Sequence, residues 1–205
     1  MRFVLPVVVS ALLLAGCASG PADQPQNTTP SIPGVDDVIA APGEVQGQGT
    51  VIQVGDAPPQ LCLGAIAESY PPQCGGPEIT GWDWATAEGF ETSGGVTWGA
   101  YVVTGGWDGI TFSATSSMML ALYDPMPVVE PLLDPENAGD TDPTELERIQ
   151  TELGDSAPFT VLESSIQNGY LWVRVIYDDG SIQRWANETY LPDAVVIRAA
   201  LRDIG

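Results

Sequence analysis

The side chains of this 205-residue chain that could perform chemistry are mostly carboxylates. It contains 27 Asp and Glu residues against six arginines, and it has no histidine and no lysine. Without histidine the chain cannot by itself build a Ser-His-Asp or Cys-His relay or a histidine-ligated zinc site. Without lysine it cannot form a Schiff base. Carboxylates, tyrosines, hydroxyls and arginines are therefore the groups left for catalysis or binding.

Several carboxylates lie beside tryptophans and are the first candidates for acid-pair catalysis. A hydrolase of this kind needs two carboxyl groups roughly 5–10 Å apart with separated pKa values. Because acids are so abundant here, spacing alone selects no pair. A carboxylate-based envelope hydrolase is thus an alternative function, and we assign no catalytic residue. The four candidates are Asp83, Glu88, Glu91 and Asp108.

A partial calcium-loop pattern follows later in the chain. Oxygen donors and a turn glycine fall at the first, third, sixth, ninth and twelfth positions of an EF-hand loop. Ala138 stands at the fifth position, which needs an oxygen ligand. Calcium-dependent interaction is therefore a weaker alternative, and we expect no cofactor. The pattern consists of Asp134, Glu136, Gly139, Asp142 and Glu145.

The same residues also fit the start of a helix. Asp142 suits an N-cap, Pro143 suits the first helical position, and Glu145 would complete a capping box. This interpretation needs no metal.

The charge is one-sided, with a formal net charge of −21. After Arg2 the next basic residue is Arg148. Such a surface repels nucleic acid phosphates, so we expect no nucleic-acid partner. It suits a soluble exported protein, or one that attracts cations or a basic partner.

The N-terminus has the layout of a secretory signal. Arg2 precedes an apolar stretch at 3–14, which is shorter than the roughly 20 residues needed to span a bilayer. Small residues, Ala15 and Gly16, follow, and then Cys17.

The sequence Leu14-Ala15-Gly16-Cys17 resembles a bacterial lipobox. In that family the cysteine thiol receives a diacylglyceryl group and the signal is cut just before it. The resemblance implies a signal peptide at 1–16 and a lipid, such as palmitate, on Cys17. Two or more acyl chains hold a protein on a membrane, which places this chain on the extracytoplasmic side of the cell membrane. The alternative is an ordinary signal peptide with a chance cysteine.

Residues 17–44 are predicted to form the lipidated N-terminus and a flexible tether. The segment is rich in Pro, Gln, Thr and Asn and has few large apolar residues. A flexible coil of this length has a reach of roughly 30 Å.

Lipidation of Cys17 would leave only Cys62 and Cys74. Export places these two in an oxidising compartment, so we expect a disulfide bond between them. Closing that loop is worth about 3 kcal/mol in the chain-entropy view. A redox pair is the alternative, but the spacing is not C-x-x-C and no basic group is nearby to lower a thiol pKa.

Residues 45–123 are predicted to form an all-β barrel or sandwich with a disulfide. Short strands are expected at 50–54 and 61–63, and a hairpin at 96–104 and 110–116. Trp82 and Trp84 would share a face if they lie in a strand. The tryptophans of this module would either fill its core or stack on sugars. They are Trp82, Trp84, Trp98 and Trp107.

The span at roughly 48–115 also resembles small uncharacterised lipoproteins of high-GC Gram-positive bacteria, through "LCLGAIAESYPPQCGGPEITGWDW" and "WGAYVVTGGWDG". That resemblance implies no activity and no site residues.

An acidic, proline-rich linker or rigid loop at 124–142 leads to a small α+β module at 143–205. We expect the order helix, strand, strand, helix, strand. The first helix should end at Gly154, Asn168-Gly169 should form a hairpin turn, and Ser181 would cap the second helix, with a longer hairpin as the alternative. A final strand is expected at 194–201. All five arginines after Arg2 lie in this module.

The leading functional hypothesis is a membrane-anchored extracytoplasmic lipoprotein that is not an enzyme. It would bind a protein, an envelope polymer or a small ligand. This hypothesis rests on the lipobox and the layout of the chain, and not on a site.

Overall fold

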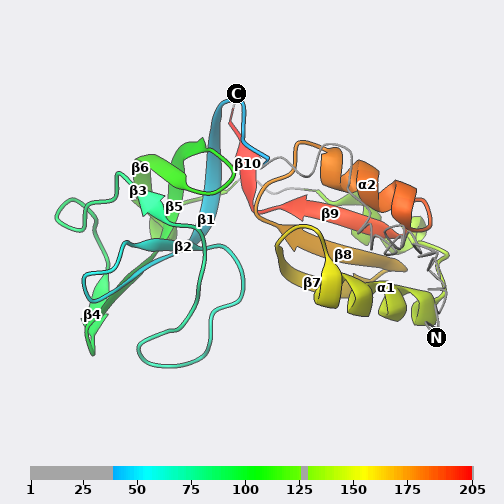
Figure 1. Cartoon of the computed structure of the whole chain (residues 1–205), viewed down its shortest axis with the longest axis horizontal. Helices are drawn as coiled ribbons and strands as arrows, with labels where there is room; N and C mark the ends of the chain where they lie inside the picture. Colours follow the sequence, from blue (N-terminus) through cyan, green and yellow to red (C-terminus); the bar gives the residue numbers. More distant parts are fainter. Residues whose placement is uncertain (1–38, 126–128, 205) are drawn as a thin grey trace, which may run out of the picture. The chain divides into compact units, whose positions relative to one another are not determined.

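The computed structural model describes residues 39–125 and 129–204. The expected signal peptide at 1–16, Cys17 and most of the tether lie outside the described residues. The expected fold class is confirmed, since a nearly closed barrel-like sheet is followed by a small α+β unit with two helices (Figure 1). No described helix is both long enough and apolar enough to cross a membrane.

The first sheet is built on two long strands that pair antiparallel along their full length. Glu44 lies opposite Gly106 at one end and Val54 opposite Val96 at the other. The other edge of β1 carries two short strands, β10 and β2, and β4 pairs with the start of β5. The strands are β1 (Glu44–Val54), β2 (Gln60–Cys62), β3 (Ile79–Thr80), β4 (Glu91–Ser93), β5 (Val96–Trp107), β6 (Phe112–Met119) and β10 (Leu201–Asp203).

A β-bulge bends the β5–β6 pair at Thr104 and Gly105. A Cβ atom added at Gly105 would lie 2.0 Å from the carbonyl oxygen of Ser113. At the next residue, Gly106, a Cβ atom would meet nothing within 4 Å. The bulge therefore requires glycine at residue 105 and not at residue 106.

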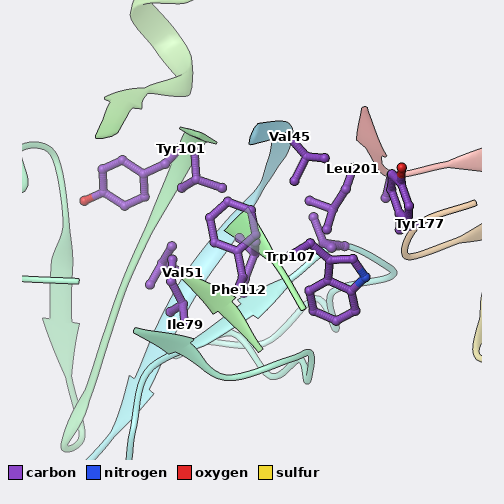
Figure 2. Close-up of a cluster of buried hydrophobic side chains, with 12 residues drawn as sticks. Val45, Val51, Ile79, Tyr101, Trp107, Phe112, Tyr177 and Leu201 are labelled. Atoms are coloured by element: carbon purple, nitrogen blue, oxygen red, sulfur yellow. The ribbon is translucent and has the colours of Figure 1, made fainter. Parts of the chain in front are cut away.

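The core of the first sheet is aromatic and aliphatic (Figure 2). Phe112 is fully buried, and Tyr101 is buried with its hydroxyl donating to the carbonyl oxygen of Glu88 at 3.0 Å. Tyr177 and Leu201, from the C-terminal part of the chain, belong to the same cluster. The first core is therefore completed by residues distant in sequence.

The second sheet has the order β7 (Val161–Gln167), β8 (Tyr170–Val175) and β9 (Val195–Ala199), with β8 and β9 parallel. Asn168 and Gly169 form the turn between the first two, with φ of 53° and 80°. Both values are positive, as a type I′ turn requires, which confirms the expected hairpin. The inward residues of β8 are buried against the helices, and they are Leu171, Val173 and Val175.

The first helix, α1 (Pro143–Ser156), begins as predicted, because the side chain of Asp142 accepts from the backbone N–H of Thr144 at 2.8 Å. The expected capping box is not seen, since Glu145 instead accepts from Arg148 at 2.7 Å. The helix continues two residues beyond Gly154. A glycine with open space around it does not by itself end a helix whose apolar stripe is buried.

The second helix, α2 (Ser181–Thr189), is present, but the prediction that Ser181 caps it is wrong. Asp178 Oδ1 accepts from the backbone N–H groups of Gly180 and Ile182, at 3.0 and 2.9 Å. The Ser181 hydroxyl instead lies beside the Asp179 carboxylate and, with the backbone N–H of Ser181, lowers the pKa of that carboxyl. The αL conformation of Gly180, φ 92°, lets an aspartate earlier in the turn reach the helix end.

The expected final strand at 194–201 is two strands in two different sheets. β9 ends at Ala199 and β10 begins at Leu201, so Ala200 alone connects them. β10 pairs antiparallel with β1, placing Arg202 opposite Gln46 (Figure 1). One arginine of the predicted second module therefore lies in the first sheet.

The acidic linker contains two 3₁₀ turns, η2 (Pro131–Leu133) and η3 (Pro135–Asn137). The Asn168 side chain donates to the carbonyl oxygens of Leu132 and Asp134, both at 2.8 Å. The described part of the linker is thus held against the β7–β8 hairpin, as a rigid connecting loop would be.

Candidate functional site

The expected disulfide is present between Cys62 and Cys74, with Cα atoms 6.0 Å apart. Cys62 ends β2 and is 1% exposed, within a small cluster that includes Ile52 and Val96. The bond thereby ties the loop after β2 to the sheet. Its burial suits a structural crosslink rather than a reactive redox pair.

The tryptophans are divided between core and surface. Trp107 is buried, and its Nε1 donates to the carbonyl oxygen of Ile39 at 2.9 Å. Trp82 and Trp84 lie in the loop after β3, so the expectation that they share a strand face is wrong. Their rings meet edge-to-face at 5.3 Å, and Trp82 packs on Tyr101 at 4.8 Å. They are half-buried and cover the edge of the core.

The four carboxylates suggested for catalysis serve separate local roles. Asp83 accepts from the N–H of Ala85, and Glu91 accepts from the hydroxyl of Tyr70. Glu88 is exposed. Asp108 accepts from two backbone N–H groups in its turn, and these bonds hold its pKa below the ordinary value. A general acid needs the opposite shift.

The calcium pattern is likewise divided between turns. Asp134 accepts from the N–H of Glu136 to cap η3, and Asp142 caps α1. Glu145 is paired with Arg148 on the helix. Within 39–125 and 129–204, no group of three or more Cys, Asp or Glu side chains is arranged to hold a metal ion.

The most distinctive polar site is a groove that sequence reasoning did not assign. It has a volume of about 740 Å³ and lies along β1, the residues after β6, and the segment that joins β9 to β10. Three of the five arginines after Arg2 line it. We call it the arginine groove, and its lining is Gln46, Gly47, Gln48, Tyr123, Asp124, Pro125, Arg174, Arg198, Ala199, Ala200, Arg202, Asp203 and Ile204.

Two of these arginines are direct neighbours in the second sheet. Arg174 on β8 is in register with Arg198 on β9, so both side chains project from one face, about 4.8 Å apart at the backbone. The alternate residues of β8 and β9 that face the helices are apolar and buried. The arginines therefore project from the face that the helices leave uncovered.

Arg198 is fixed by its neighbours. Glu130 accepts from its Nε at 2.9 Å and lies 2.5 Å from its Nη2. A third donor, Nη1, bonds the carbonyl oxygen of Ile197, and the guanidinium lies 4.9 Å from the centre of the Trp172 ring. The acidic linker thus holds one wall of the groove through Glu130.

Arg174 and Arg202 have fewer described ion-pair contacts than Arg198. Arg174 has a single loose contact with Glu163 at 3.5 Å. Arg202 is exposed on β10, and no described carboxylate lies within 4.0 Å of its nitrogens. Both guanidinium groups therefore keep N–H donors free of described ion-pair partners.

Two acids also line the groove. Asp203 accepts from the buried Tyr177 hydroxyl at 3.1 Å, and burial, reinforced by this contact, raises the pKa of Tyr177 to about 12. Asp124 is exposed. On the opposite wall, the Tyr123 hydroxyl donates to Gln46 at 2.9 Å. The lining thus carries three positive and two negative side chains.

A smaller hollow continues from the groove over the uncovered face of the second sheet. It shares Arg174 and Arg198 with the groove and extends to Trp172 and Leu133. The one signal that could have located this site in the sequence is the confinement of every arginine after Arg2 to 148–202. Local patterns could not show that the strand carrying Arg202 joins the first sheet. There Arg202 lines the groove together with Arg174 and Arg198.

Comparisons of the chain with protein-family models, with curated proteins and with solved structures give no match.

Proposed function

We propose that this protein is a lipid-anchored extracytoplasmic protein that binds a ligand or partner without catalysing a reaction. The lipid would be carried by Cys17, and the residues before Ile39 would act as the tether. The expected end of the tether at residue 44 is too late, because Ile39 and Ala41 already bond Trp107 through their backbone and Glu44 belongs to β1. The folded part, from Ile39 onward, would be presented outside the cell membrane.

The observation that carries the proposal is the pairing of Cys62 with Cys74. Structural disulfides are typical of exported proteins and rare in reducing compartments. The pairing also uses both other cysteines, so Cys17 has no cysteine partner left within the chain. Its place behind Leu14-Ala15-Gly16 then gives it a function, as the site of lipidation.

The arrangement of polar groups supports a binding role more than a catalytic one. Asp83 and Asp108, beside the tryptophans, are used in turns, and the pKa of Asp108 is lowered. The arginine groove, by contrast, holds side chains whose donors are not all used internally.

Metabolic labelling with a clickable palmitate analogue in a bacterial host, followed by membrane fractionation, tests the anchor. The full chain should be labelled and should sediment with membranes, whereas Cys17→Ser should lose the label and become soluble. Ser19→Ala is the matched control, and should behave as the unaltered chain. A Cys17→Ser variant that keeps both label and membrane association would contradict the proposal.

A further inference from the structure

We propose that the arginine groove binds a small organic anion that carries one or two carboxylate or phosphate groups. This inference rests on the proposed binding role and names the ligand class. It does not depend on the lipid at Cys17, so the two proposals can fail separately.

The first argument is the distribution of charge. The chain has a net charge of −21, and no basic side chain occurs between Arg2 and Arg148. Three of the remaining five arginines nevertheless line one groove. Clustered charges of one sign in a cleft raise the local concentration of the opposite ion. In this molecule the groove is the place where an anion meets cations from both sheets.

The second argument is the register of the two sheet arginines. Arg174 and Arg198 carry like charges on paired positions, which repel unless an anion lies near them. Glu130 supplies that anion to Arg198 through a two-point contact. Arg174 has only the 3.5 Å contact with Glu163. An anionic ligand at Arg174 would complete the neutralisation that Glu130 provides at its neighbour.

The third argument is the geometry of the available donors. A guanidinium presents N–H groups in a planar fork that matches a carboxylate or phosphate. Arg198 is held in place by Trp172 and Glu130 and so forms a fixed wall. Arg174 and Arg202 come from different sheets and line the same groove, where they can bind the ligand from two sides.

The size and charge of the groove select a small ligand over a polymer. A volume of about 740 Å³ lies within the 300–1,000 Å³ typical of small-molecule sites. The lining has three arginines against Asp124 and Asp203, and Glu130 already neutralises Arg198. A polyanion would extend beyond the groove onto a surface of net negative charge and be repelled there. The donors left for a compact ligand with one or two negative charges are those of Arg174 and Arg202.

Isothermal titration calorimetry tests the proposal, with the full chain carrying Cys17→Ser so that lipid is absent. Succinate and inorganic phosphate are the probes, each titrated at low ionic strength. Sodium chloride at matched ionic strength is the blank. We expect saturable binding of at least one probe at a single site. Trp172 provides a second readout, because an anion beside Arg198 should change its fluorescence.

Three variants locate the site. Arg202→Gln and Arg174→Gln should each raise the dissociation constant about tenfold, because each removes a charge-assisted contact. Arg184→Gln is the matched control: it makes the same charge change on α2, outside the groove, and should leave binding within twofold. Arg202→Lys keeps the positive charge but lacks the planar fork of N–H donors. Its dissociation constant should therefore lie between those of the unaltered protein and of Arg202→Gln. Circular dichroism melts confirm that each variant folds.

Binding of either probe with these variant effects supports the proposal, and the stronger probe identifies the anionic group. Saturable binding of neither probe at 10 mM, on the order of the weakest useful affinity, would overturn it. So would equal weakening by Arg184→Gln, which would indicate general charge attraction. Vesicles of phosphatidylglycerol form the last arm, and tighter binding to vesicles than to free phosphate would contradict a small soluble ligand.

Discussion

The two sheets of this protein are stabilised in different ways. The first has seven strands, most of them short, and relies on a disulfide and on glycines that let backbones approach closely. The second has three strands covered by two capped helices, and its core is a compact set of Leu, Ile, Val and Ala side chains. Its described residues contain no cysteine. Where helices cover a sheet, packing fixes the strands, and where they do not, covalent and backbone constraints take that role.

The charges are divided along the same boundary. Four of the five arginines after Arg2 belong to the helix-covered unit, and the fifth, Arg202, is brought to the first sheet by β10. The first sheet otherwise presents acids and neutral polar groups. The groove between Gln46 and Arg174 is lined by charged and polar side chains from both kinds of surface.

The largest expected effect tests the role of close backbone approach in the first sheet. Gly105→Ala would place a Cβ atom 2.0 Å from the Ser113 carbonyl oxygen, so β5 and β6 must separate. We expect a loss of about 4 kcal/mol in the free energy of unfolding, at the upper end of single-residue effects. Denaturant unfolding followed by tryptophan fluorescence measures it.

Gly106→Ala is the matched control, one residue further along β5 with open space around it. It should change stability by less than about 1 kcal/mol. Equal losses in the two variants would show that the contact with Ser113 is not what requires glycine at the bulge.

The second effect concerns the disulfide. Replacing Cys62 and Cys74 together by serine should lower the free energy of unfolding by about 3 kcal/mol, because the unfolded chain loses its closed loop. Reduction of the unaltered protein should produce the same change in a thermal melt. If the double variant melts with the unaltered protein, the first sheet does not depend on its crosslink, and the contrast between the two units is smaller than drawn above.

The third effect is the helix cap in the second unit. Asp178→Ala removes the acceptor for two backbone N–H groups at the start of α2 and should cost about 1 kcal/mol. Ser181→Ala removes a hydroxyl that lies beside the exposed Asp179 and does not cap the helix, so it should change stability by less than about 0.5 kcal/mol. Urea unfolding of the two variants, measured side by side, shows whether Asp178 or Ser181 caps the helix. A larger loss for Ser181→Ala would restore the serine as the cap.

The last effect is a pH dependence. Burial raises the pKa of Tyr177, in the first core, and of Tyr190, in the second, each to about 12. An unperturbed tyrosine titrates near pH 10. The unfolded chain therefore loses these protons first as pH rises, so the contribution of these two tyrosines to stability should be constant below about pH 10 and decline between pH 10 and 12.

Ultraviolet absorbance of phenolate during alkaline titration measures this. Tyr177→Phe and Tyr190→Phe should each remove one late-titrating group. A titration in which neither variant removes a late-titrating phenol would contradict this assignment.

Local patterns predicted the elements whose signals are local. The Asn168-Gly169 turn and the cap at Asp142 both follow from residue types a few positions apart. The predicted cap of α2 was wrong because Ser181 is also a good capping residue, and only the αL conformation of Gly180 shows that Asp178 reaches the helix end.

The candidate site could not be predicted in the same way. Trp82 and Trp84 alternate as a strand would, yet they lie in a loop because Tyr101 offers a surface for their rings. The pairing of β10 with β1 joins residues from opposite ends of the described chain, and no short pattern encodes it. Since that pairing positions Arg202, the groove itself depends on long-range topology.

The single-residue step at Ala200 also bears on the order in which the protein can fold during synthesis. A ribosome delivers β1 early and β10 only after nearly all of the described chain. Until then the edge of β1 at Val45 has no partner from β10, and the first core lacks Leu201 and Tyr177. The seven-stranded unit therefore comes first in sequence but is finished last, and the arginine groove is assembled in that final step.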